Sequence, residues 1–336
     1  MKISHNASLL AFNTFGIDVK ADYLIEYESE SDLQAVLQMD IVRQNKLLHV
    51  GTGSNLLFLS DYKGVVLHSC IKYIRELDEK NISAYLQVGA GVLWDDLVAH
   101  TVKCGYGGME NLSLIPSEVG AAVVQNIGAY GMEVNEMVMK VDAVEISSGK
   151  IKTFSNSECK YGYRDSVFKN ELKGKYIITQ VLFALEKKPA FKLSYQHLEE
   201  EVKKNGMVNL ENIRKTIIAI RESKLPDTKE FGNAGSFFMN PVIPTLKYTE
   251  LQKEFPEMPC YHISDTEKKV PAAWLIDKCG WKGKQIGKAG VHANQALVLI
   301  NLGGASGTEI VHLAEQIQTS VKDRFGIELI PEVNYI

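Results

Sequence analysis

The chain has 336 residues, of which 45% are hydrophobic and 23% charged, the balance of a folded protein with about two or three domains. The 37 Lys and Arg residues nearly match the 41 Asp and Glu residues, which excludes a surface built to follow nucleic-acid phosphates. No stretch approaches the ~20 apolar residues of a membrane span, and the N-terminal residues show no secretion signal, so we expect a cytoplasmic protein.

The histidines and cysteines predict neither a metal site nor a disulfide framework. The eight histidines lack His-x-x-x-His and Glu-x-x-His spacing, so no metal is expected. The cysteines are odd in number, lie among apolar neighbours and form no Cys-x-x-Cys pair, which predicts buried, reduced thiols. They are Cys70, Cys104, Cys159, Cys260 and Cys279.

The first clear element is a helix. Ser31 and Gln34 form a capping box in the sequence, and Leu33, Val36 and Leu37 then recur at helical spacing. We therefore predict a helix that begins at this serine and buries these three apolar side chains.

Two short buried strands are predicted over residues 47–50 and 65–68. A small-residue loop, Gly51-Thr52-Gly53-Ser54-Asn55, follows the first of them. This loop is not a Rossmann fingerprint, because it lacks the third glycine and is followed by apolar residues instead of a helix start.

A strand over 84–88 precedes a helix over about 92–103, which Gly105 ends. The side chains expected to face the core from this helix are Leu93, Leu97 and Val98. The later elements are a hairpin, a strand, a helix, a strand, a last helix and a final strand. Their predicted ranges are 141–146 with 151–154, 177–185, 209–224, 296–300, 308–325 and 327–333. Because Pro331 lacks an N–H group, the final strand is expected at a sheet edge.

Two loops of small residues, 51–55 and 113–131, have the composition that lets a backbone approach a diphosphate closely. Either loop alone is more often a tight turn. Together they favour a site for a large flat cofactor, since Gln125 and Asn126 add uncharged donors among the glycines. Composition does not identify that cofactor.

Three polar residues are ambiguous when each is taken alone. Arg164 is either a surface cation beside a carboxylate or a guanidinium that pairs with a substrate carboxylate. Ser236 is either a turn or cap serine or a proton donor, and Glu332 is either an exposed strand carboxylate or a catalytic group. The residue types alone leave these alternatives open.

Seven ordered segments carry a family resemblance. They are NTFGIDVKADYLI (13–25), VGTGSNLLFL (50–59), SLIPSEVGAAVVQNIGAYG (113–131), CKYGYRDSVFK (159–169), NAGSFFMNP (233–241), PAAWLIDKCGWKG (271–283) and PEV (331–333). From about residue 10 to 335 the chain resembles the UDP-N-acetylenolpyruvoylglucosamine reductases, also called UDP-N-acetylmuramate dehydrogenases. Each segment is weak alone, but seven of them in order at compatible spacing are specific.

The resemblance implies an α+β protein. Two N-terminal subdomains form an FAD-binding fold of the vanillyl-alcohol oxidase type, and a C-terminal α/β domain covers the substrate. The implied boundaries are 1–70 together with 327–336, 71–224, and 225–326.

The resemblance also implies the activity. The protein is expected to hold FAD non-covalently and to use NADPH to reduce UDP-N-acetylglucosamine enolpyruvate to UDP-N-acetylmuramate, a step in peptidoglycan synthesis. Its expected partners are these small molecules alone, with no nucleic acid or membrane, and a monomer is expected.

The site residues are carried over from the family pattern. The catalytic positions are Arg164, Ser236 and Glu332. The cofactor positions are Gly51, Thr52, Gly53, Ser54, Asn55, Ser113, Pro116, Gly120, Gln125, Asn126, Gly128 and Tyr163. The substrate positions are Tyr195, Lys224, Asn240 and Gln295, with Tyr195 resembling the tyrosine that closes over the nucleotide in the longer family type.

The implied chemistry gives each catalytic residue a task. Arg164 and Glu332 stabilise the enolate that forms when hydride reaches the enolpyruvyl carbon, so Glu332 must be protonated or share a proton. Ser236 then protonates the adjacent carbon. One rival is a flavin oxidase, which would often tether FAD through a histidine, and no histidine lies in 107–131. The other rival is a nucleotide-sugar binding protein without activity.

The cofactor loop departs from the family pattern. It reads Pro116-Ser117-Glu118-Val119 where Pro-Gly-Thr-Val is usual, and Ala122-Val123 where Ala-Pro is common. Since a carboxylate beside a diphosphate is repulsive, we expect the Glu118 side chain to point outward.

Overall fold

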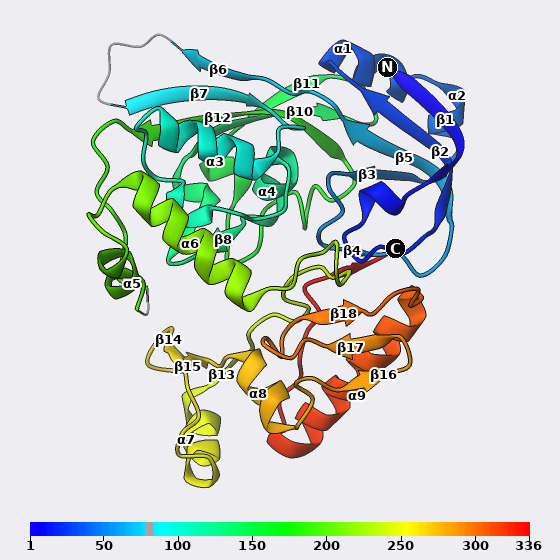
Figure 1. Ribbon diagram of the computed structural model, residues 1–336. Coiled ribbons are helices and arrows are strands. Elements are labelled where there is room, and N and C mark those ends of the chain that lie inside the picture. The colour runs from blue at the N-terminus through cyan, green and yellow to red at the C-terminus, as the bar shows by residue number, and fades with distance from the viewer. Residues whose placement is uncertain (78–82, 196) are drawn as a thin grey trace. The chain divides into compact units, whose positions relative to one another are not determined.

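The computed structural model describes residues 1–77, 83–195 and 197–336 (Figure 1). The chain divides into two compact units, which are described separately. The first unit comprises residues 1–7, 21–52 and 63–221. The second unit comprises residues 8–20, 53–62 and 222–336.

A mixed sheet in the first unit pairs its strands in the order β1-β2-β5-β3. The bounds are β1 Lys2–Ser8, β2 Lys20–Tyr27, β3 Leu47–Val50 and β5 Tyr62–Ser69. The predicted strands 47–50 and 65–68 are confirmed, and they pair in parallel with Leu47 opposite Val65. Helix α1, Glu30–Leu37, buries Leu33, Val36 and Leu37 in the core beneath this sheet, as predicted. The short helix α2, Asp40–Arg43, follows it.

The predicted cap of α1 is wrong by two residues. Ser29, not Ser31, is the N-cap, and its hydroxyl oxygen accepts a hydrogen bond from the backbone N–H of Asp32. Ser29 has the extended backbone that a cap requires, while Ser31 already lies inside the helix. Gln34 instead donates its side-chain amide to the carbonyl of Gly149.

An antiparallel sheet forms the rest of the first unit's framework, with strand order β11-β10-β12-β7-β6. The bounds are β6 Ile74–Leu77, β7 Ser83–Gly89, β10 Val138–Glu145, β11 Ile151–Ser155 and β12 Tyr176–Glu186. The predicted hairpin is confirmed, because Val144 lies opposite Ile151. Short strands β8, Gly128–Ala129, and β9, Met132–Glu133, pair with each other.

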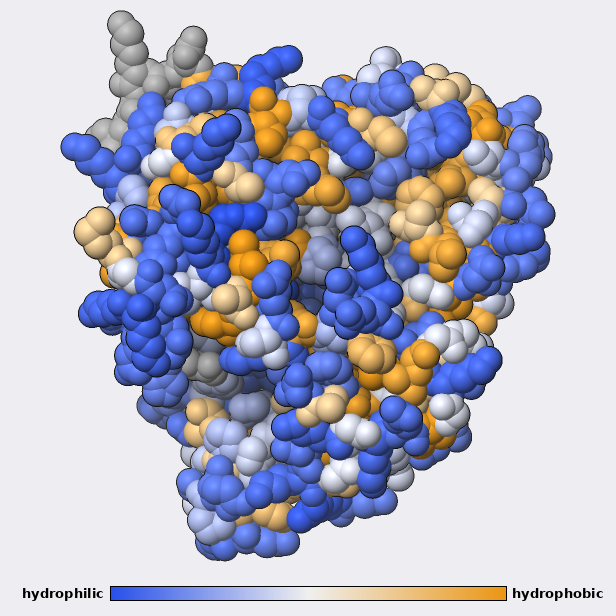
Figure 2. All heavy atoms as spheres, viewed as in Figure 1, coloured by the Kyte–Doolittle hydropathy of each residue, from blue (hydrophilic) through white to orange (hydrophobic). Residues whose placement is uncertain are grey.

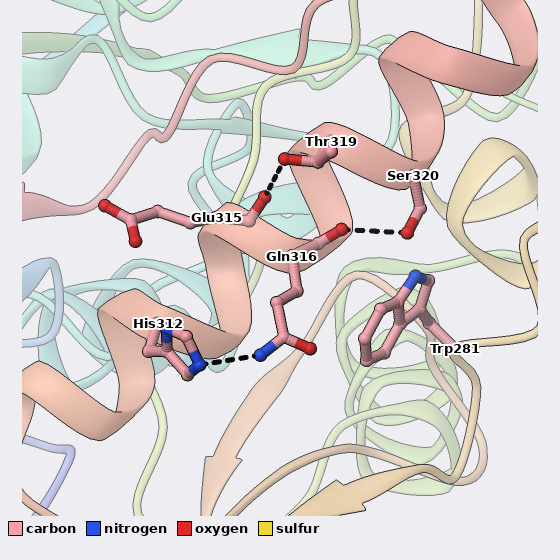
Figure 3. Close-up of a pocket in the computed structure, with 6 residues that line it drawn as sticks. All are labelled: Trp281, His312, Glu315, Gln316, Thr319 and Ser320. Atoms are coloured by element: carbon pink, nitrogen blue, oxygen red, sulfur yellow. Dashed lines mark hydrogen bonds between the residues drawn. The ribbon is translucent and has the colours of Figure 1, made fainter.

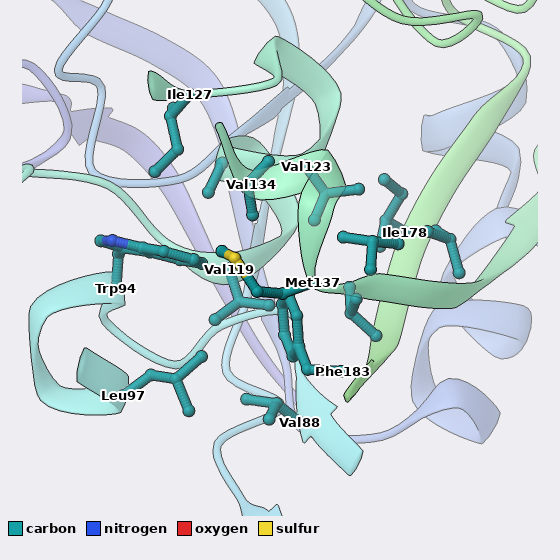
Figure 4. Packing of buried hydrophobic residues seen from close by; sticks show 14 of the residues in the cluster. Val88, Trp94, Leu97, Val119, Val123, Ile127, Val134, Met137, Ile178 and Phe183 are labelled. Carbon is teal, nitrogen blue, oxygen red and sulfur yellow. The ribbon is translucent and has the colours of Figure 1, made fainter. Parts of the chain in front are cut away.

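Helices α3, Trp94–Lys103, and α4, Val119–Gln125, cover one face of this sheet (Figure 1). Figure 4 shows Val119 of α4 packed among Trp94, Met137 and Phe183. The Trp94 and Phe183 rings meet edge to face with centroids 6.1 Å apart. This core holds the start of α4 rigidly against the sheet.

The start of α3 corrects one predicted core residue. Leu93 is 44% exposed, whereas Trp94, Leu97 and Val98 are fully buried. Leu93 is the extended N-cap residue, so the helical face begins one residue later than the pattern indicated. The indole N–H of Trp94 donates to the carbonyl of Leu112, which satisfies its buried polar atom.

Helices α5, Leu198–Lys204, and α6, Leu210–Lys224, pack together through Leu198, Val202, Ile213 and Ile217. An ion pair joins α6 to α3, because both guanidinium ends of Arg214 donate to the carboxylate of Asp95 at 2.6 and 2.8 Å. The same carboxylate accepts the backbone N–H of Leu114 at 2.6 Å. Burial opposes ionisation of Asp95, but the hydrogen bonds and charge of Arg214 prevail and lower its pKa.

The second unit contains short sheets and three helices among its described residues. The strands are β4 Leu56–Leu57, β13 Val242–Pro244, β14 Tyr261–His262, β15 Glu267–Lys269, β16 Gln285–Ile286, β17 Ala289–Val291, β18 Leu299–Asn301 and β19 Asn334–Tyr335. The helices are α7 Thr245–Glu254, α8 Ala272–Lys278 and α9 Gly307–Phe325. Helix α9 confirms the predicted helix 308–325 and ends at Gly326 in the left-handed conformation. Its start has a capping box between Ser306 and Glu309, which the sequence analysis did not identify.

Two strand predictions in the second unit are wrong. The expected strand 296–300 is confined to β18, and the segment 327–333 makes only an isolated bridge, between Pro331 and Phe238. The C-terminal strand is β19, which pairs in parallel with β4. Pro331 removes a backbone donor, so regular pairing starts only after it.

The cysteines and the surface can be compared with the sequence-based expectations. The expectation that the thiols are buried is confirmed only for Cys159, since Cys70 and Cys279 are half-buried and Cys104 and Cys260 are exposed. Figure 2 shows hydrophobic and hydrophilic residues interspersed over the face in view. Among the described helices, none combines the length and the apolar character needed to cross a bilayer.

We predict that Arg214→Met lowers the free energy of unfolding by about 1–3 kcal/mol, since it leaves the partly buried Asp95 without its charged donor. Lys215→Met is the matched control on the same helix, because Lys215 pairs with Glu211 in full solvent and should change nothing measurable. Urea unfolding of both variants measures the difference. Equal stabilities for the two would contradict a structural role for the Arg214–Asp95 pair.

Candidate active site

The loop after β3 begins in the first unit with Gly51 and Thr52. The Thr52 hydroxyl donates to the carbonyl of Pro116 at 3.2 Å, so it joins the two predicted cofactor loops. A Cβ atom on Gly51 would lie only 3.0 Å from the carboxyl of Glu118. Glycine at 51 therefore permits the close approach of these loops.

The remainder of that loop, Gly53 to Asn55, belongs to the second unit. Gly53 has a positive φ of 67°, and a Cβ there would overlap the carbonyl of Phe12 at 1.8 Å. Its own carbonyl accepts the N–H of Thr14. The NTFGI segment therefore shapes this loop, a role that sequence reasoning did not assign to it.

The second predicted cofactor loop is built around α4. Ser113 is fully buried and donates its hydroxyl to the carbonyl of Glu110, whereas Pro116 is exposed. The N–H of Gly120 donates to the carbonyl of Ala90 at 2.9 Å, and a Cβ at 120 would touch the Ala90 side chain. Gln125 and Gly128 are half-buried and remain predicted cofactor residues.

Glu118 points inward, so its predicted orientation is wrong. Its residue surface is only 5% exposed, and its Oε1 lies 3.8 Å from Nε2 of His68. The cause is backbone pairing, since Trp94 N–H donates to the carbonyl of Ser117 and Val119 N–H donates to that of Val92. These bonds hold the segment so that its glutamate side chain enters the junction of the two loops.

Burial decides the charge of this junction. It raises the pKa of Glu118 to about 8, although the charge of Lys72 acts in the opposite direction. Burial also lowers the pKa of His68, although a hydrogen bond to the Val50 carbonyl opposes the shift. Both groups are therefore uncharged at neutral pH, and their 3.8 Å contact is not an ion pair.

The hydrogen bond to Val50 also determines the tautomer of His68. Since a carbonyl can only accept, Nδ1 carries the proton in this 3.1 Å bond. Nε2 is then the accepting nitrogen of the neutral ring, and it faces the carboxyl of Glu118. Sequence reasoning missed His68, which reads as an ordinary member of strand β5.

Asn126 links the end of α4 to the turn that carries Arg164. It is fully buried with φ of 44°, and its side-chain nitrogen donates to Glu133 Oε2 and to the carbonyl of Gly162, both at 2.8 Å. Its side-chain oxygen accepts the N–H of Asn135 at 3.1 Å. Because the side-chain amide is committed to protein groups, any contact of Asn126 with a cofactor would come from its backbone.

Arg164 lies at the tip of a tight turn closed by Gly162 and Asp165, whose backbones exchange two hydrogen bonds at 3.0 and 3.1 Å. Its φ is 55°, a left-handed conformation that costs a non-glycine residue about 1 kcal/mol or more. Nη1 would lie 3.6 Å from a Cβ at Gly128, so the guanidinium reaches back to the second loop. Tyr163 beside it is 46% exposed.

Tyr195 lies in the first unit, in the segment before α5. Its ring meets that of Tyr130 edge to face at 5.9 Å, and its Cβ lies 3.6 Å from a Cβ built on Gly131. The structure thus brings the predicted nucleotide-closing tyrosine to the end of the second loop. Burial raises the pKa of Tyr130.

The second unit brings three of the predicted residues together. The N–H of Glu332 donates to the carbonyl of Phe237 at 2.8 Å, which places Glu332 beside the residue that follows Ser236. The side-chain amide of Asn55 donates to the Glu332 carbonyl at 3.1 Å. Ser236 is exposed and bridges to Val298, while Glu332 is half-buried.

The remaining predicted substrate residues occupy other parts of the second unit. Asn240 accepts the N–H of Ala272 through its side-chain oxygen at 2.9 Å and so caps α8. Gln295 accepts the N–H of Val298 through its backbone carbonyl. Lys224 is exposed at the end of α6.

A separate hollow of about 340 Å³ lies along α9 (Figure 3). Its lining residues are Trp281, His312, Glu315, Gln316, Thr319 and Ser320. None of the predicted site residues is among them. Figure 3 shows the polar side chains bonded within the helix, such as Gln316 to His312 at 2.8 Å, so the hollow presents no converging groups.

Two family models match this chain. One, described as an FAD binding domain, matches residues 21–155. The other, described as the C-terminal domain of UDP-N-acetylenolpyruvoylglucosamine reductase, matches residues 226–336.

Curated relatives extend the match to the whole chain. The UDP-N-acetylenolpyruvoylglucosamine reductase of Bacteroides fragilis is 47% identical over 98% of this chain and 98% of its own length. The protein of the same name from Porphyromonas gingivalis is 45% identical over 100% of both chains. The chain belongs to the UDP-N-acetylenolpyruvoylglucosamine reductase family.

The family resemblance read from the sequence is confirmed, and the chain is an FAD-dependent oxidoreductase. A crystal structure of UDP-N-acetylenolpyruvylglucosamine reductase from Thermus caldophilus superposes with a TM-score of 0.69. It covers 99% of this chain and 98% of its own at 22% identity, so it shows the fold alone. The expected α+β class with an FAD-binding fold is confirmed.

The reductase family requires FAD, and the junction of the two loops suits its anionic diphosphate. Thr52 supplies a half-buried hydroxyl, and glycines at 51 and 120 keep side chains out of the way. An ionised glutamate would oppose the phosphates, but burial keeps Glu118 protonated at neutral pH. The residues present therefore fit the cofactor.

We predict that Glu118→Gln stabilises the FAD-free protein increasingly as the pH rises. The folded protein holds the Glu118 proton up to about pH 8, whereas the ordinary pKa of 4.5 applies after unfolding. The contribution of the Glu118 proton to the free energy of unfolding is therefore complete below pH 4.5. It is lost as the pH rises from 4.5 through 8, and the loss is on the order of 1 kcal/mol for each pH unit.

Urea unfolding at about pH 5 and about pH 8 measures the effect. Glu171→Gln, at an exposed carboxylate, is the control and should shift stability equally at both values. A Glu118→Gln difference that stays constant between the two pH values would show that Glu118 is ionised in the folded protein.

Proposed function

We propose that this chain uses NADPH to reduce UDP-N-acetylglucosamine enolpyruvate to UDP-N-acetylmuramate through FAD, in peptidoglycan synthesis. One observation carries the proposal, which is the full-length relationship to reductases that bear this substrate in their name, at 47% identity over 98% of the chain. The FAD-binding domain over 21–155 agrees with it.

We assign FAD to the two small-residue loops. The proposed contacts come from residues 51–55, from Ser113, Pro116, Gly120, Gln125 and Gly128, from the Asn126 backbone, and from Tyr163. Bound FAD supplies the hydride chemistry that no side chain can perform, so the protein contributes orientation and electrostatics.

Arg164 and Glu332 are proposed to bind the enolpyruvyl carboxylate and to stabilise the negative charge that reaches it during reduction. A guanidinium supports this role because it pairs with both oxygens of a carboxylate. The turn at Arg164 also supports this role. Hydrogen bonds between the backbones of Gly162 and Asp165 hold Arg164 in a strained left-handed conformation with φ of 55°. Glu332 must share a proton to assist.

Ser236 is proposed to donate a proton to the carbon next to the substrate carboxylate. Its exposure and its position beside Phe237, which bonds to Glu332, are consistent with access to a ligand. Substrate contacts are assigned to Tyr195, Lys224, Asn240 and Gln295. Since the oxygen of Asn240 caps α8, its amide nitrogen is the group that would donate to the nucleotide.

We place the protein in the cytoplasm, where NADPH and nucleotide sugars are supplied, and expect it to act as a monomer. We also propose that residues 1–70 with 327–336, and residues 71–224, hold FAD, while residues 225–326 hold the substrate.

The test of the function is NADPH oxidation by the purified yellow protein. Oxidation should depend on the enolpyruvyl sugar and produce UDP-N-acetylmuramate, with the flavin released by heat or acid. Turnover with oxygen alone at the same rate would identify an oxidase instead. Flavin that stays attached to the denatured chain would support the same rival.

The role of Ser236 predicts a split between the two halves of the cycle. Ser236→Ala should reduce its flavin with NADPH at nearly the normal rate, because that step needs no proton from serine. Reoxidation by the enolpyruvyl sugar should fall by about 10²–10⁴-fold, the usual loss for a general acid. Stopped-flow absorbance resolves both steps, and Ser236→Cys should recover part of the lost rate.

Stopped-flow absorbance also tests the roles of Arg164 and Glu332. Arg164→Met and Glu332→Gln should slow reoxidation far more than they weaken substrate binding, with Glu332→Gln more active than Glu332→Ala. A Ser236→Ala variant slow in flavin reduction but normal in reoxidation would remove its proton-donor role.

A further inference from the structure

The Glu118 carboxyl lies at the junction of the two proposed FAD loops. Its Oε2 would be 3.0 Å from a Cβ on Gly51, in the first loop, and its own backbone begins α4, in the second. Thr52 and Pro116 are bonded directly beside it. The carboxyl therefore lies where the two loops approach each other.

This carboxyl has no hydrogen-bond donor within the described residues. The residue is 5% exposed, and its side chain makes no capping bond to α4. Nε2 of His68 lies 3.8 Å from Oε1, but this nitrogen is an acceptor. The carboxyl is therefore available to pair with a polar atom of a bound ligand.

The titratable groups that face Glu118 leave it protonated. From β5 comes His68, from β2 comes Tyr27, and from the segment after β5 come Cys70 and Lys72. Burial lowers the pKa of His68 and raises those of Tyr27 and Cys70, so these three are neutral at pH 7. Lys72 is exposed, and its charge does not overcome the effect of burial on Glu118.

We infer that the protonated carboxyl of Glu118 donates a hydrogen bond to the FAD diphosphate. A neutral acid in an apolar site is a good donor to an anion, whereas its ionised form would repel the phosphates. The inference rests on the proposed placement of FAD across the two loops. No covalent change is involved, because the proton stays on the carboxyl oxygen.

A linkage between FAD and the proton follows. The diphosphate is a diester whose charge stays constant near neutral pH, so its presence raises the Glu118 pKa further. Above about pH 8 the Glu118 carboxyl of the FAD-free protein is ionised. FAD binding then requires that this carboxylate take up a proton, which weakens the binding. The Kd for FAD should therefore rise by up to about tenfold for each pH unit above that value.

The test is a titration of FAD into the full-length, FAD-free chain, followed by quenching of flavin fluorescence between about pH 6 and about pH 9. Wild type should show the rising Kd. Glu118→Gln keeps a donor but cannot ionise, so its Kd should stay flat and close to the wild-type value at low pH. Glu118→Ala loses the donor, so its Kd should be about tenfold higher at pH 6.

Glu110→Gln is the matched control. Glu110 is also buried, and burial raises its pKa, but its carboxyl accepts the N–H of Gly108 and does not face Gly51. This variant should keep the wild-type pH dependence of FAD binding. Calorimetry at about pH 9 in buffers of different ionisation enthalpy should also show proton uptake on FAD binding by wild type, and none by Glu118→Gln.

Parallel Kd curves for wild type and Glu118→Gln, or an unchanged Kd for Glu118→Ala, would overturn the inference. Either result would leave the proposed function intact, because FAD would still bind. A chain that binds no FAD at pH 6 would instead contradict the proposed function itself.

Discussion

The close backbone approach of two loops is the constraint on which the cofactor side of this molecule depends. Thr52 bonds to the Pro116 carbonyl, and Gly120 bonds to the Ala90 carbonyl, so both loops are held by main-chain oxygen atoms. The absence of a side chain at Gly51 leaves room for the Glu118 carboxyl. A methyl group at that position would force the carboxyl to move, and the polar junction would change with it.

The proposed catalytic groups lie in short segments that are held by a few hydrogen bonds rather than by long regular elements. Arg164 depends on a turn whose Gly162 carbonyl is bonded by Asn126, and Glu332 depends on a bond to the Phe237 carbonyl. Helices and sheets lie behind these segments and bury the apolar core. Short polar segments therefore supply the proposed catalytic groups, and the packed helices and sheets stabilise the fold.

The sequence predicted those helices and strands whose signals lie within a few neighbouring residues. The strand over 47–50, the hairpin around 147–150 and helix α9 needed only short apolar runs, turn residues and apolar side chains at helical spacing. The cap of α1 was assigned to Ser31 because two serines compete there, and the choice of Ser29 depends on where the chain leaves β2. Pro331 delayed the last strand beyond its predicted range.

The sequence predicted only those residues of the candidate site that lie in the family segments. The family segments led to the assignment of Arg164, Ser236 and Glu332, which stays a prediction, whereas the family membership is shown by the relatives. Glu118 was misjudged because its pKa depends on burial beside Gly51 and beside His68 of β5, which are far away in sequence. His68 was missed for the same reason, since nothing local distinguishes it from other strand residues.

The amide of Asn126 limits which side chains this position can accept. Its nitrogen serves two acceptors and its oxygen serves one donor, so aspartate, with the same shape, would lose both donated bonds. It would also place a second carboxylate beside Glu133. A carboxylate at this one position would therefore release the turn that carries Arg164, although the shape of the side chain would be unchanged.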